Sequence, residues 1–225
     1  MAAAWQPIRY TAMYRKHLAL SAKMADYYGW EAAEQFMSPD DEARRVREGV
    51  GLSDVSWLGK LDVKGKDAKT KSQIPNSGFV WRLAQGHWLV TCEPQDLDGA
   101  WEDLERLSAT TDCLHATDVT SVYAALLLAG PRSRDILHKL TEIDVSDAAM
   151  PNLSCSQTGL AHVHAIVLRQ DMGDVLGYLL LVGREYGEYV WDTLMQAGQE
   201  EGIVPFGLTA QRQISNPKSQ NLAPL

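Results

Sequence analysis

The stretch from Arg47 to Ala68 constrains the fold more than any other part of the chain, because it combines turns with a strand of alternating polarity. It reads Arg-Glu-Gly-Val-Gly-Leu-Ser-Asp-Val-Ser-Trp-Leu-Gly-Lys-Leu-Asp-Val-Lys-Gly-Lys-Asp-Ala. Gly49 and Gly51 are predicted to take positive φ angles that stop a helix. Residues 60–64 alternate polar and apolar side chains, which is the period of a half-buried strand, and Gly65 marks the end of that strand.

Helical patterns occur on both sides of this stretch. Ser38 and Pro39, followed by three acidic residues, form a strong helix start, because serine caps a helix and proline suits its first turn. Helices are predicted over residues 10–28, 38–47, 96–108, 131–140 and 184–197. On the last of these, the residues expected on the inner side are Tyr186, Tyr189, Val190, Trp191 and Leu194.

The remaining ordered segments have strand patterns. Residues 79–83 and 87–92 flank a short turn with a glycine, which predicts a β-hairpin. Further strands are expected over residues 120–128, 160–169 and 177–182. The fold class is therefore α+β, with mostly antiparallel sheets covered by helices and two related α/β halves. We predict a single domain over residues 1–214, with halves 1–115 and 116–214, and a flexible tail over residues 215–225.

Composition excludes several classes of partner. The net charge of −8 argues against nucleic acid and anionic membranes, which attract basic proteins. No apolar run approaches the roughly 20 residues needed to cross a bilayer, and the first residues lack a signal-peptide pattern. The three cysteines are widely spaced, so neither a disulfide framework nor a zinc motif is indicated. We expect a cytoplasmic protein with reduced thiols.

Motifs that carry chemistry are scarce. His162 and His164 are predicted to share one face of a strand, where they could supply two metal ligands. No third ligand stands at a matching spacing, so ordinary polar positions are the expected reading, and no metal site is predicted. The chain also lacks the phosphate-binding glycine motifs and the GxSxG nucleophile elbow.

The stretch from Arg47 to Ala68 resembles the glycine-cleavage T-protein (aminomethyltransferase) family. Members of that family run Val-Arg, Gly-Leu, Asp-Val-Ser, Gly, a strand and a further Gly. Four other segments are similar to the same family: 21–31, 126–137, 169–178 and 206–210. The resemblance implies a T-protein-like folate-binding fold, in which both halves contribute strands to one sheet around a central opening.

The chain departs from the family at two functional positions. In T-proteins a glutamate between the equivalents of Arg169 and Tyr178 hydrogen-bonds the pterin ring of tetrahydrofolate. Val175 stands at that place here, with Asp174 one residue away. The family also places an acidic residue beside the reactive folate nitrogen, in a long segment that is reduced here to residues 69–78, without Asp or Glu. We expect the catalytic acid and the C-terminal barrel domain to be absent, as in the short form that resembles the gamma subunit of heterotetrameric sarcosine oxidase.

The resemblance implies a tetrahydrofolate-binding, aminomethyltransferase-like protein that is one component of an amine or methyl-group demethylation system. If it is an enzyme, it is a folate-dependent one-carbon transferase that acts with partner subunits. The partner would be a flavin-dependent amine oxidase or demethylase subunit, or a second copy of the chain. The alternative is a non-catalytic assembly subunit that kept the fold and lost the folate site.

Six residues are candidate folate contacts. Trp57 and Leu58 would form apolar walls, Asp174 would bind the pterin, and Tyr178 would stack on it. Arg169 or Arg212 would bind the glutamate tail. Each residue could instead have a purely structural role. Leu58 and Tyr178 could be core residues, and Arg169 could pair with an acid on an adjacent strand.

Overall fold

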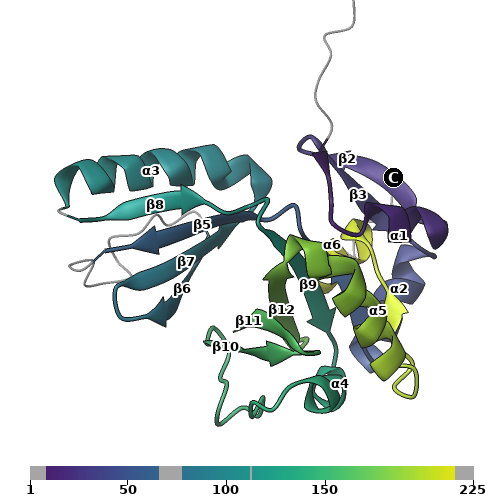
Figure 1. Ribbon diagram of the computed structural model, residues 1–225. Coiled ribbons are helices and arrows are strands. Elements are labelled where there is room, and N and C mark those ends of the chain that lie inside the picture. The colour runs from purple at the N-terminus through teal and green to yellow at the C-terminus, as the bar shows by residue number, and fades with distance from the viewer. Residues whose placement is uncertain (1–8, 66–77, 112, 216–225) are drawn as a thin grey trace, which may run out of the picture.

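The computed structural model describes residues 9–65, 78–111 and 113–215, which form three sheets and six α-helices (Figure 1). The largest sheet has six strands in the order β10-β11-β12-β9-β4-β13. These strands are β4 (Gly51–Asp54), β9 (Tyr123–Ala129), β10 (Cys155–Leu160), β11 (Val163–Arg169), β12 (Gly177–Gly183) and β13 (Val204–Pro205). All neighbours are antiparallel except β13, which pairs parallel to β4. The sheet therefore combines strands from both halves, as the resemblance implied.

Alternation along the central strands gives this sheet two apolar faces. On β9 and β12, even-numbered residues such as Leu126 and Leu180 pack under α4 (Ser133–Leu140) and α5 (Gly187–Ala197), on what we call the covered face. Odd-numbered residues of these two strands, such as Leu127 and Leu179, lie on the opposite, inner face. Because side chains alternate across a strand, adjacent residues on these strands belong to different cores.

The inner face is closed by the rest of the molecule. Its core includes side chains from α2 (Pro39–Glu48) and α6 (Leu208–Ser215). It also includes a three-stranded sheet in the order β1-β3-β2, formed by β1 (Arg9–Tyr10), β2 (Lys23–Tyr27) and β3 (Trp30–Gln35). The short helix α1 (Tyr14–Ala19) precedes β2.

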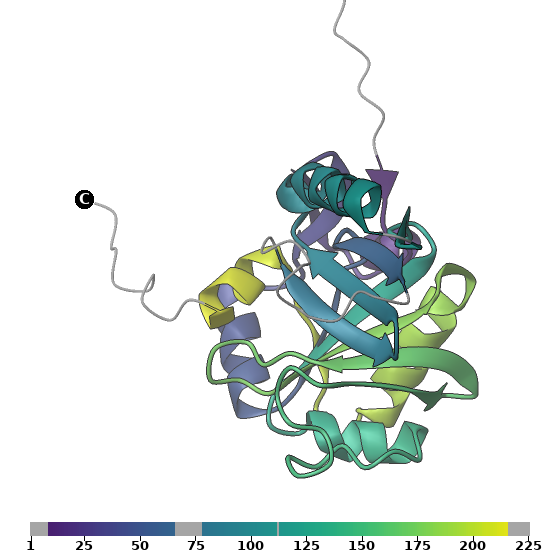
Figure 2. The same ribbon diagram turned by 90° about the vertical axis from the view of Figure 1, so that its left-hand side faces the viewer.

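The third sheet has four antiparallel strands in the order β6-β7-β5-β8. They are β5 (Gly59–Lys64), β6 (Phe79–Ala84), β7 (His87–Cys92) and β8 (His115–Asp118). The helix α3 (Leu97–Thr110) covers one face of this sheet (Figures 1 and 2). On that face Leu61 and Val90 pack against Leu104. The other face contributes Trp81 and Leu89 to the inner core. Two 3-10 helices, Pro94–Asp96 and Arg184–Tyr186, lead into α3 and α5.

A buried polar turn joins β4 to β5 and so links two of the sheets. Oδ1 of Asp54 accepts hydrogen bonds from the backbone N–H of Ser56 at 2.9 Å and from its hydroxyl at 2.6 Å. The Ser56 Oγ in turn accepts from the backbone N–H of Ala125 on β9 at 3.1 Å. The fully buried Lys60 ammonium donates to the carbonyls of Ser56 and Leu58 at 3.0 and 2.6 Å. The turn is thus fixed from inside by side chains.

Several sequence-based predictions are confirmed. The chain is a mixed α/β protein rich in antiparallel sheet, α2 begins at Pro39 after Ser38, and β6 and β7 form the predicted hairpin. Residues 60–64 lie in β5, and the helix expected over residues 96–108 is α3. Among the described residues, no helix is long and apolar enough to span a membrane.

The helix predicted over residues 10–28 is wrong over most of its length. Only Tyr14–Ala19 is helical, and the chain then turns at Ser21 with φ of 58° before entering β2. Pairing of β2 with β3 along its whole length outweighs the local apolar spacing, because tertiary contacts override a weak helical preference.

The expected positive φ angles at Gly49 and Gly51 are also wrong. Gly49 has φ of −141°, and Gly51 lies within β4 rather than in a turn. Glycine is needed at position 51 for space, since a Cβ there would lie 2.5 Å from Cγ2 of Val46 and 2.7 Å from Cδ1 of Phe206. The constraint is close packing of α2 and the segment after β13 against β4.

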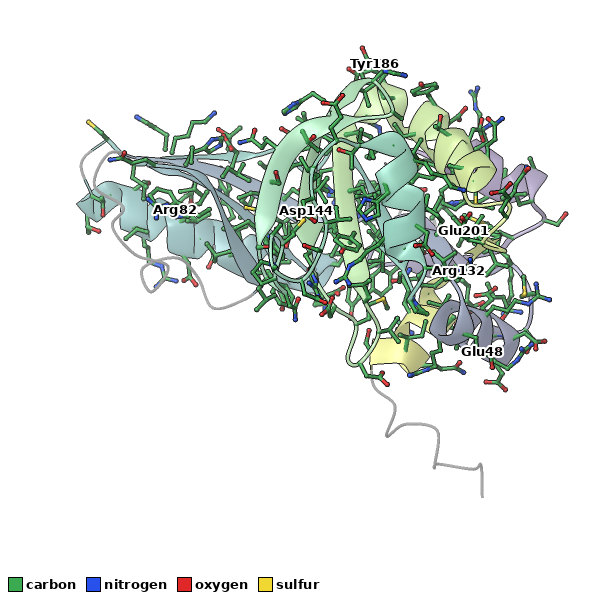
Figure 3. All side chains as sticks on the ribbon, turned by 90° about the horizontal axis from the view of Figure 1, so that it is seen from below. Glu48, Arg82, Arg132, Asp144, Tyr186 and Glu201 are labelled. Carbon is green, nitrogen blue, oxygen red and sulfur yellow. The ribbon has the colours of Figure 1, made fainter. Side chains whose placement is uncertain are left out.

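Two aromatic residues expected on the inner side of α5 lie at the surface. Tyr186 projects from the edge of the molecule (Figure 3). The exposed fractions of Tyr186 and Tyr189 are 45% and 47%. The strand predicted over 160–169 is β11 from Val163 onward, whereas Leu160 ends β10, because Ala161 and His162 form a turn with positive φ angles. The predicted tail begins inside α6, which extends to Ser215, and residues 216–225 lie outside the described residues.

A glycine at the turn after β9 should be essential for stability. Gly130 has φ of +123°, and a Cβ would lie 2.4 Å from the carbonyl oxygen of Gly49. We expect Gly130→Ala to lower the free energy of unfolding by about 3 kcal/mol through backbone strain and overlap. Gly99→Ala is the matched control, because a Cβ at Gly99 in α3 meets nothing within 4 Å. Urea unfolding of both variants measures the difference, and equal stabilities would contradict the argument.

Lys60 should make stability depend on pH. Burial lowers the pKa of Lys60 to about 7, against about 10.4 in an unfolded chain. Between these values the unfolded state holds a proton that the folded state has released, so the free energy of unfolding rises with pH from about 7 to 10.

The Lys60→Met variant removes this titration. The difference in unfolding free energy between wild type and Lys60→Met should therefore grow in favour of wild type across that range, as measured by denaturant unfolding at each pH. A difference that stays constant from pH 7 to pH 10 would show that Lys60 is not titrating there.

Candidate functional site

Five side chains from separate parts of the chain meet beside the inner core, and we call them the central cluster: Tyr27, Trp57, Leu58, Glu93 and Arg212. The ring of Tyr27 stands edge-on to that of Trp57, with centroids 4.7 Å apart. The Tyr27 hydroxyl donates a hydrogen bond of 2.8 Å to Oε2 of Glu93. The Arg212 guanidinium lies 5.4 Å from the centroid of the Tyr27 ring, and Leu58 packs against the inner core. The cluster therefore combines aromatic, apolar, anionic and cationic groups.

Four separate segments of the chain position the five members. Tyr27 is the last residue of β2, Glu93 follows the last residue of β7, and Arg212 lies in α6. Trp57 and Leu58 belong to the polar turn between β4 and β5, whose backbone is held by Asp54 and Lys60. The site therefore forms only when three sheets and α6 are assembled.

Burial sets the protonation states in the cluster. It raises the pKa of the half-buried Glu93 carboxyl above its usual range, and the hydrogen bond from Tyr27 opposes this effect. Burial, together with the neighbouring Glu93, also raises the pKa of Tyr27 to about 12. Tyr27 is thus a neutral phenol near pH 7, which donates its proton to one oxygen of Glu93. The other oxygen, Oε1, has no hydrogen bond from the described residues.

Trp57 carries a buried donor without an acceptor. Its indole Nε1 is inaccessible to solvent and has no hydrogen-bond partner among the residues that the structure describes. Leaving such a group unpaired costs about 1–3 kcal/mol, so unpaired donors concentrate where a ligand or water completes the site.

Asp174 does not reach the central cluster. It lies in the tight loop closed by the bridge between Met172 and Val175, and its side chain is 76% exposed. Its carboxylate pairs with the Arg47 guanidinium at 3.0 Å. Val175, at the place of the family glutamate, is only 6% exposed and belongs to the inner core. The loop therefore presents no carboxylate to the inner side.

Arg169 and Tyr178 lie on the other side of the six-stranded sheet. They are direct cross-strand partners, and Tyr178 is part of the core on the covered face. The fully buried Tyr178 hydroxyl donates to the carbonyl of Val145 at 2.8 Å and accepts from Nε of Arg134 at 3.1 Å. A ring enclosed in this way has no free face for stacking on a ligand.

The Arg169 guanidinium is likewise committed to protein partners. It pairs with the carboxylates of Asp147 at 2.6 Å and Asp171 at 3.2 Å, and donates to the carbonyl of Met150 at 2.7 Å. The structure thus brings Trp57, Leu58 and Arg212 together and separates them from the other three candidates.

Tyr27 and Glu93 were missed by sequence reasoning. Tyr27 fell inside the segment predicted to be helical, which hid its position at the end of a strand. Glu93 does leave a signal, because it is an acidic residue between the buried strand β7 and Pro94.

The two histidines singled out from the sequence do not share a strand face. His162 lies in the turn before β11, with φ of 65°, whereas His164 is within the strand. No group of three metal-ligating side chains occurs within the described ranges 9–65, 78–111 and 113–215. Residues 69–77, where the family's catalytic acid is expected to be missing, lie outside the described residues.

Comparisons with known proteins agree with this architecture. The family model described as the GCVT N-terminal domain matches residues 13–74 and 69–218. The aminomethyltransferase of Symbiobacterium thermophilum is 28% identical, over 92% of this chain and 63% of that protein. Sarcosine oxidase subunit alpha of Rhizobium meliloti is 27% identical, over 91% of this chain and 25% of that protein. The chain thus spans less than two thirds of the length of these relatives.

Solved structures show the same fold. Glycine cleavage system aminomethyltransferase T from Bartonella henselae superposes with a TM-score of 0.77 at 14% identity, covering 92% of this chain and 62% of that one. A chain of the heterotetrameric sarcosine oxidase from Corynebacterium sp. U-96 gives a TM-score of 0.60 at 17% identity, covering 85% of this chain and 95% of that one. With its T-protein architecture and a family model that matches most of its length, the chain belongs to the GCVT N-terminal domain family.

Proposed function

We propose that this chain binds a reduced folate at the central cluster and serves as one component of a one-carbon system that demethylates amines or methyl donors. Membership of the family and the relatives named aminomethyltransferase and sarcosine oxidase subunit alpha support a role in folate-type one-carbon chemistry. The observation that carries the proposal is the half-buried Glu93 carboxylate, which is bound by Tyr27 and lies beside the paired Tyr27 and Trp57 rings.

The chemistry of the cluster fits the parts of tetrahydrofolate. A pterin is a flat ring with amide and amino N–H donors, which suit a carboxylate such as Glu93. Trp57 and Leu58 offer an aromatic and an aliphatic wall. The exposed Arg212, whose guanidinium lies over the Tyr27 ring, suits the anionic glutamate tail. When bound, a reduced folate supplies a nucleophilic nitrogen that captures a one-carbon unit.

The residues of this chain would bind and orient the ligand. Tyr27 holds Oε2 of Glu93, which leaves Oε1 to accept from a ring N–H. The polar turn fixes the position of Trp57, because Asp54 and Lys60 bind backbone groups of the residues on both sides of it. Asp174, the carboxylate expected from the sequence, is a weaker candidate because it already pairs with Arg47 at the surface.

A non-catalytic assembly subunit is the second candidate function. The buried Val175 favours it, because the family's pterin-binding carboxylate has no replacement at that position. The similarity to a sarcosine oxidase subunit supports a protein partner such as a flavin-dependent amine oxidase or demethylase subunit. A second copy of the chain is the alternative partner, and the cytoplasm is the proposed location. A self-sufficient aminomethyltransferase is less well supported, because the buried Val175 stands at the place of the family's pterin-binding glutamate.

Calorimetric titration with tetrahydrofolate under reducing conditions tests the folate site. We expect saturable binding at micromolar concentrations. Glu93→Gln removes a charged acceptor and should weaken binding about tenfold to a hundredfold, the loss expected for a hydrogen bond to an ionised group. Asp174→Ala is the control carboxylate and should bind as wild type does.

Two other outcomes are informative. Binding weakened by Asp174→Ala but not by Glu93→Gln would place the pterin at the loop near Val175 instead. Absence of heat, together with an unchanged melting temperature at about millimolar ligand, would contradict folate binding and favour the assembly subunit.

A further inference from the structure

A cavity lies between the three-stranded sheet and the four-stranded sheet, next to α3. Its volume is about 560 Å³, which is within the range of small-molecule sites. β1 and β3 line one side of it, and α3, β5 and the end of β8 line the other. None of its lining residues belongs to the central cluster.

Solvent-exposed charges of both signs line this cavity. Arg9 comes from β1, Asp98 from the first turn of α3, and Asp118 from the end of β8. None of the three forms an ion pair with any residue that the structure describes, although Oδ1 of Asp118 accepts the backbone N–H of Thr120 at 2.8 Å. A ligand that neutralises both Arg9 and the two aspartates must itself carry a negative group and a positive group.

Aromatic side chains complete the lining. The Arg9 guanidinium lies 5.7 Å from the centroid of the Trp30 ring, a cation–π arrangement that holds the cation at one wall. Trp101 of α3 and Tyr28 also line the cavity. Tyr28 has φ of 50°, a conformation that costs a tyrosine free energy, and its side chain is left 58% exposed at the cavity. These rings offer an apolar surface between the charged groups.

We infer that this cavity binds a small zwitterion, specifically an α-amino acid with an apolar side chain. The ligand carboxylate pairs with Arg9, and its ammonium group pairs with Asp98 and Asp118. The apolar side chain lies against Tyr28 and Trp101. The cavity adjoins the central cluster, because the Tyr28 ring lies 5.0 Å from the Tyr27 ring, but the two sites share no residue.

Three ligands that share one phenyl ring test this assignment: L-phenylalanine, 2-phenylethylamine and 3-phenylpropionate. The second lacks the carboxylate and the third lacks the ammonium group. In calorimetric titrations of the full chain, phenylalanine should bind about tenfold more tightly than either analogue, because only it satisfies both signs.

Substitutions of the lining residues test which charged group of the ligand each wall binds. Asp118→Asn should weaken phenylalanine and phenylethylamine about tenfold and leave phenylpropionate unchanged. Arg9→Gln should weaken phenylalanine and phenylpropionate and leave phenylethylamine unchanged. Asp98→Asn gives a second test of the acidic wall, and Asp103→Asn, on the same helix but outside the cavity lining, is the control.

Two results would overturn the proposal. One is the absence of binding of all three ligands at about 10 mM by wild-type protein with an unchanged melting temperature. The other is equal affinity for phenylalanine and phenylethylamine with no effect of Arg9→Gln, which would indicate a simple cation site.

Discussion

The buried turn between β4 and β5 is the interaction on which the rest of the structure depends. One carboxylate oxygen of Asp54 fixes Ser56, and Ser56 in turn binds the backbone of Ala125 in β9. Lys60 closes the same turn through two carbonyl groups, and the ring of the buried His17 lies 3.8 Å from the second oxygen of Asp54. Hydrogen bonds to buried charged groups contribute about 1.5–3 kcal/mol each. This turn therefore sets both the relation between two sheets and the position of Trp57.

The two faces of the six-stranded sheet explain why residues that match the family's sequence pattern lie away from the candidate site. Arg169 and Tyr178 match the family pattern, yet both lie on the covered face, where protein groups satisfy them. Their contacts are structural and account for their place in the pattern without a ligand. On the inner side, the buried Trp57 indole N–H has no partner among the described residues, although such atoms also occur on the covered side, as at the Ser133 hydroxyl of α4.

Features specified by local sequence could be predicted, and features that depend on distant pairing could not. The Ser38-Pro39 helix start and the glycine turn of the β6–β7 hairpin are local signals, and both were found. Strands β2 and β3 were hidden, because helical spacing of apolar residues competes with a pairing that only the folded sheet reveals. Tyr27 and Glu93 are 66 positions apart, so their contact has no local signature. A one-residue offset in a loop was equally invisible: Asp174 turns to the surface while Val175 enters the core.

The position of β13 has a consequence for biosynthesis. β13 pairs with Gly51 and Leu52 of β4, although Val204 follows Gly51 by more than 150 positions. Gly207 and Gln211 likewise supply the partners of Glu42 and Ser53. At about 5–20 residues per second, a ribosome needs on the order of ten seconds or more to deliver this last strand. Throughout that interval one edge of β4 lacks its native neighbour, and unpaired strand edges attract strands from other chains. Chaperone protection of the nascent chain would therefore matter most for the apolar, glycine-bearing edge at Gly51–Asp54.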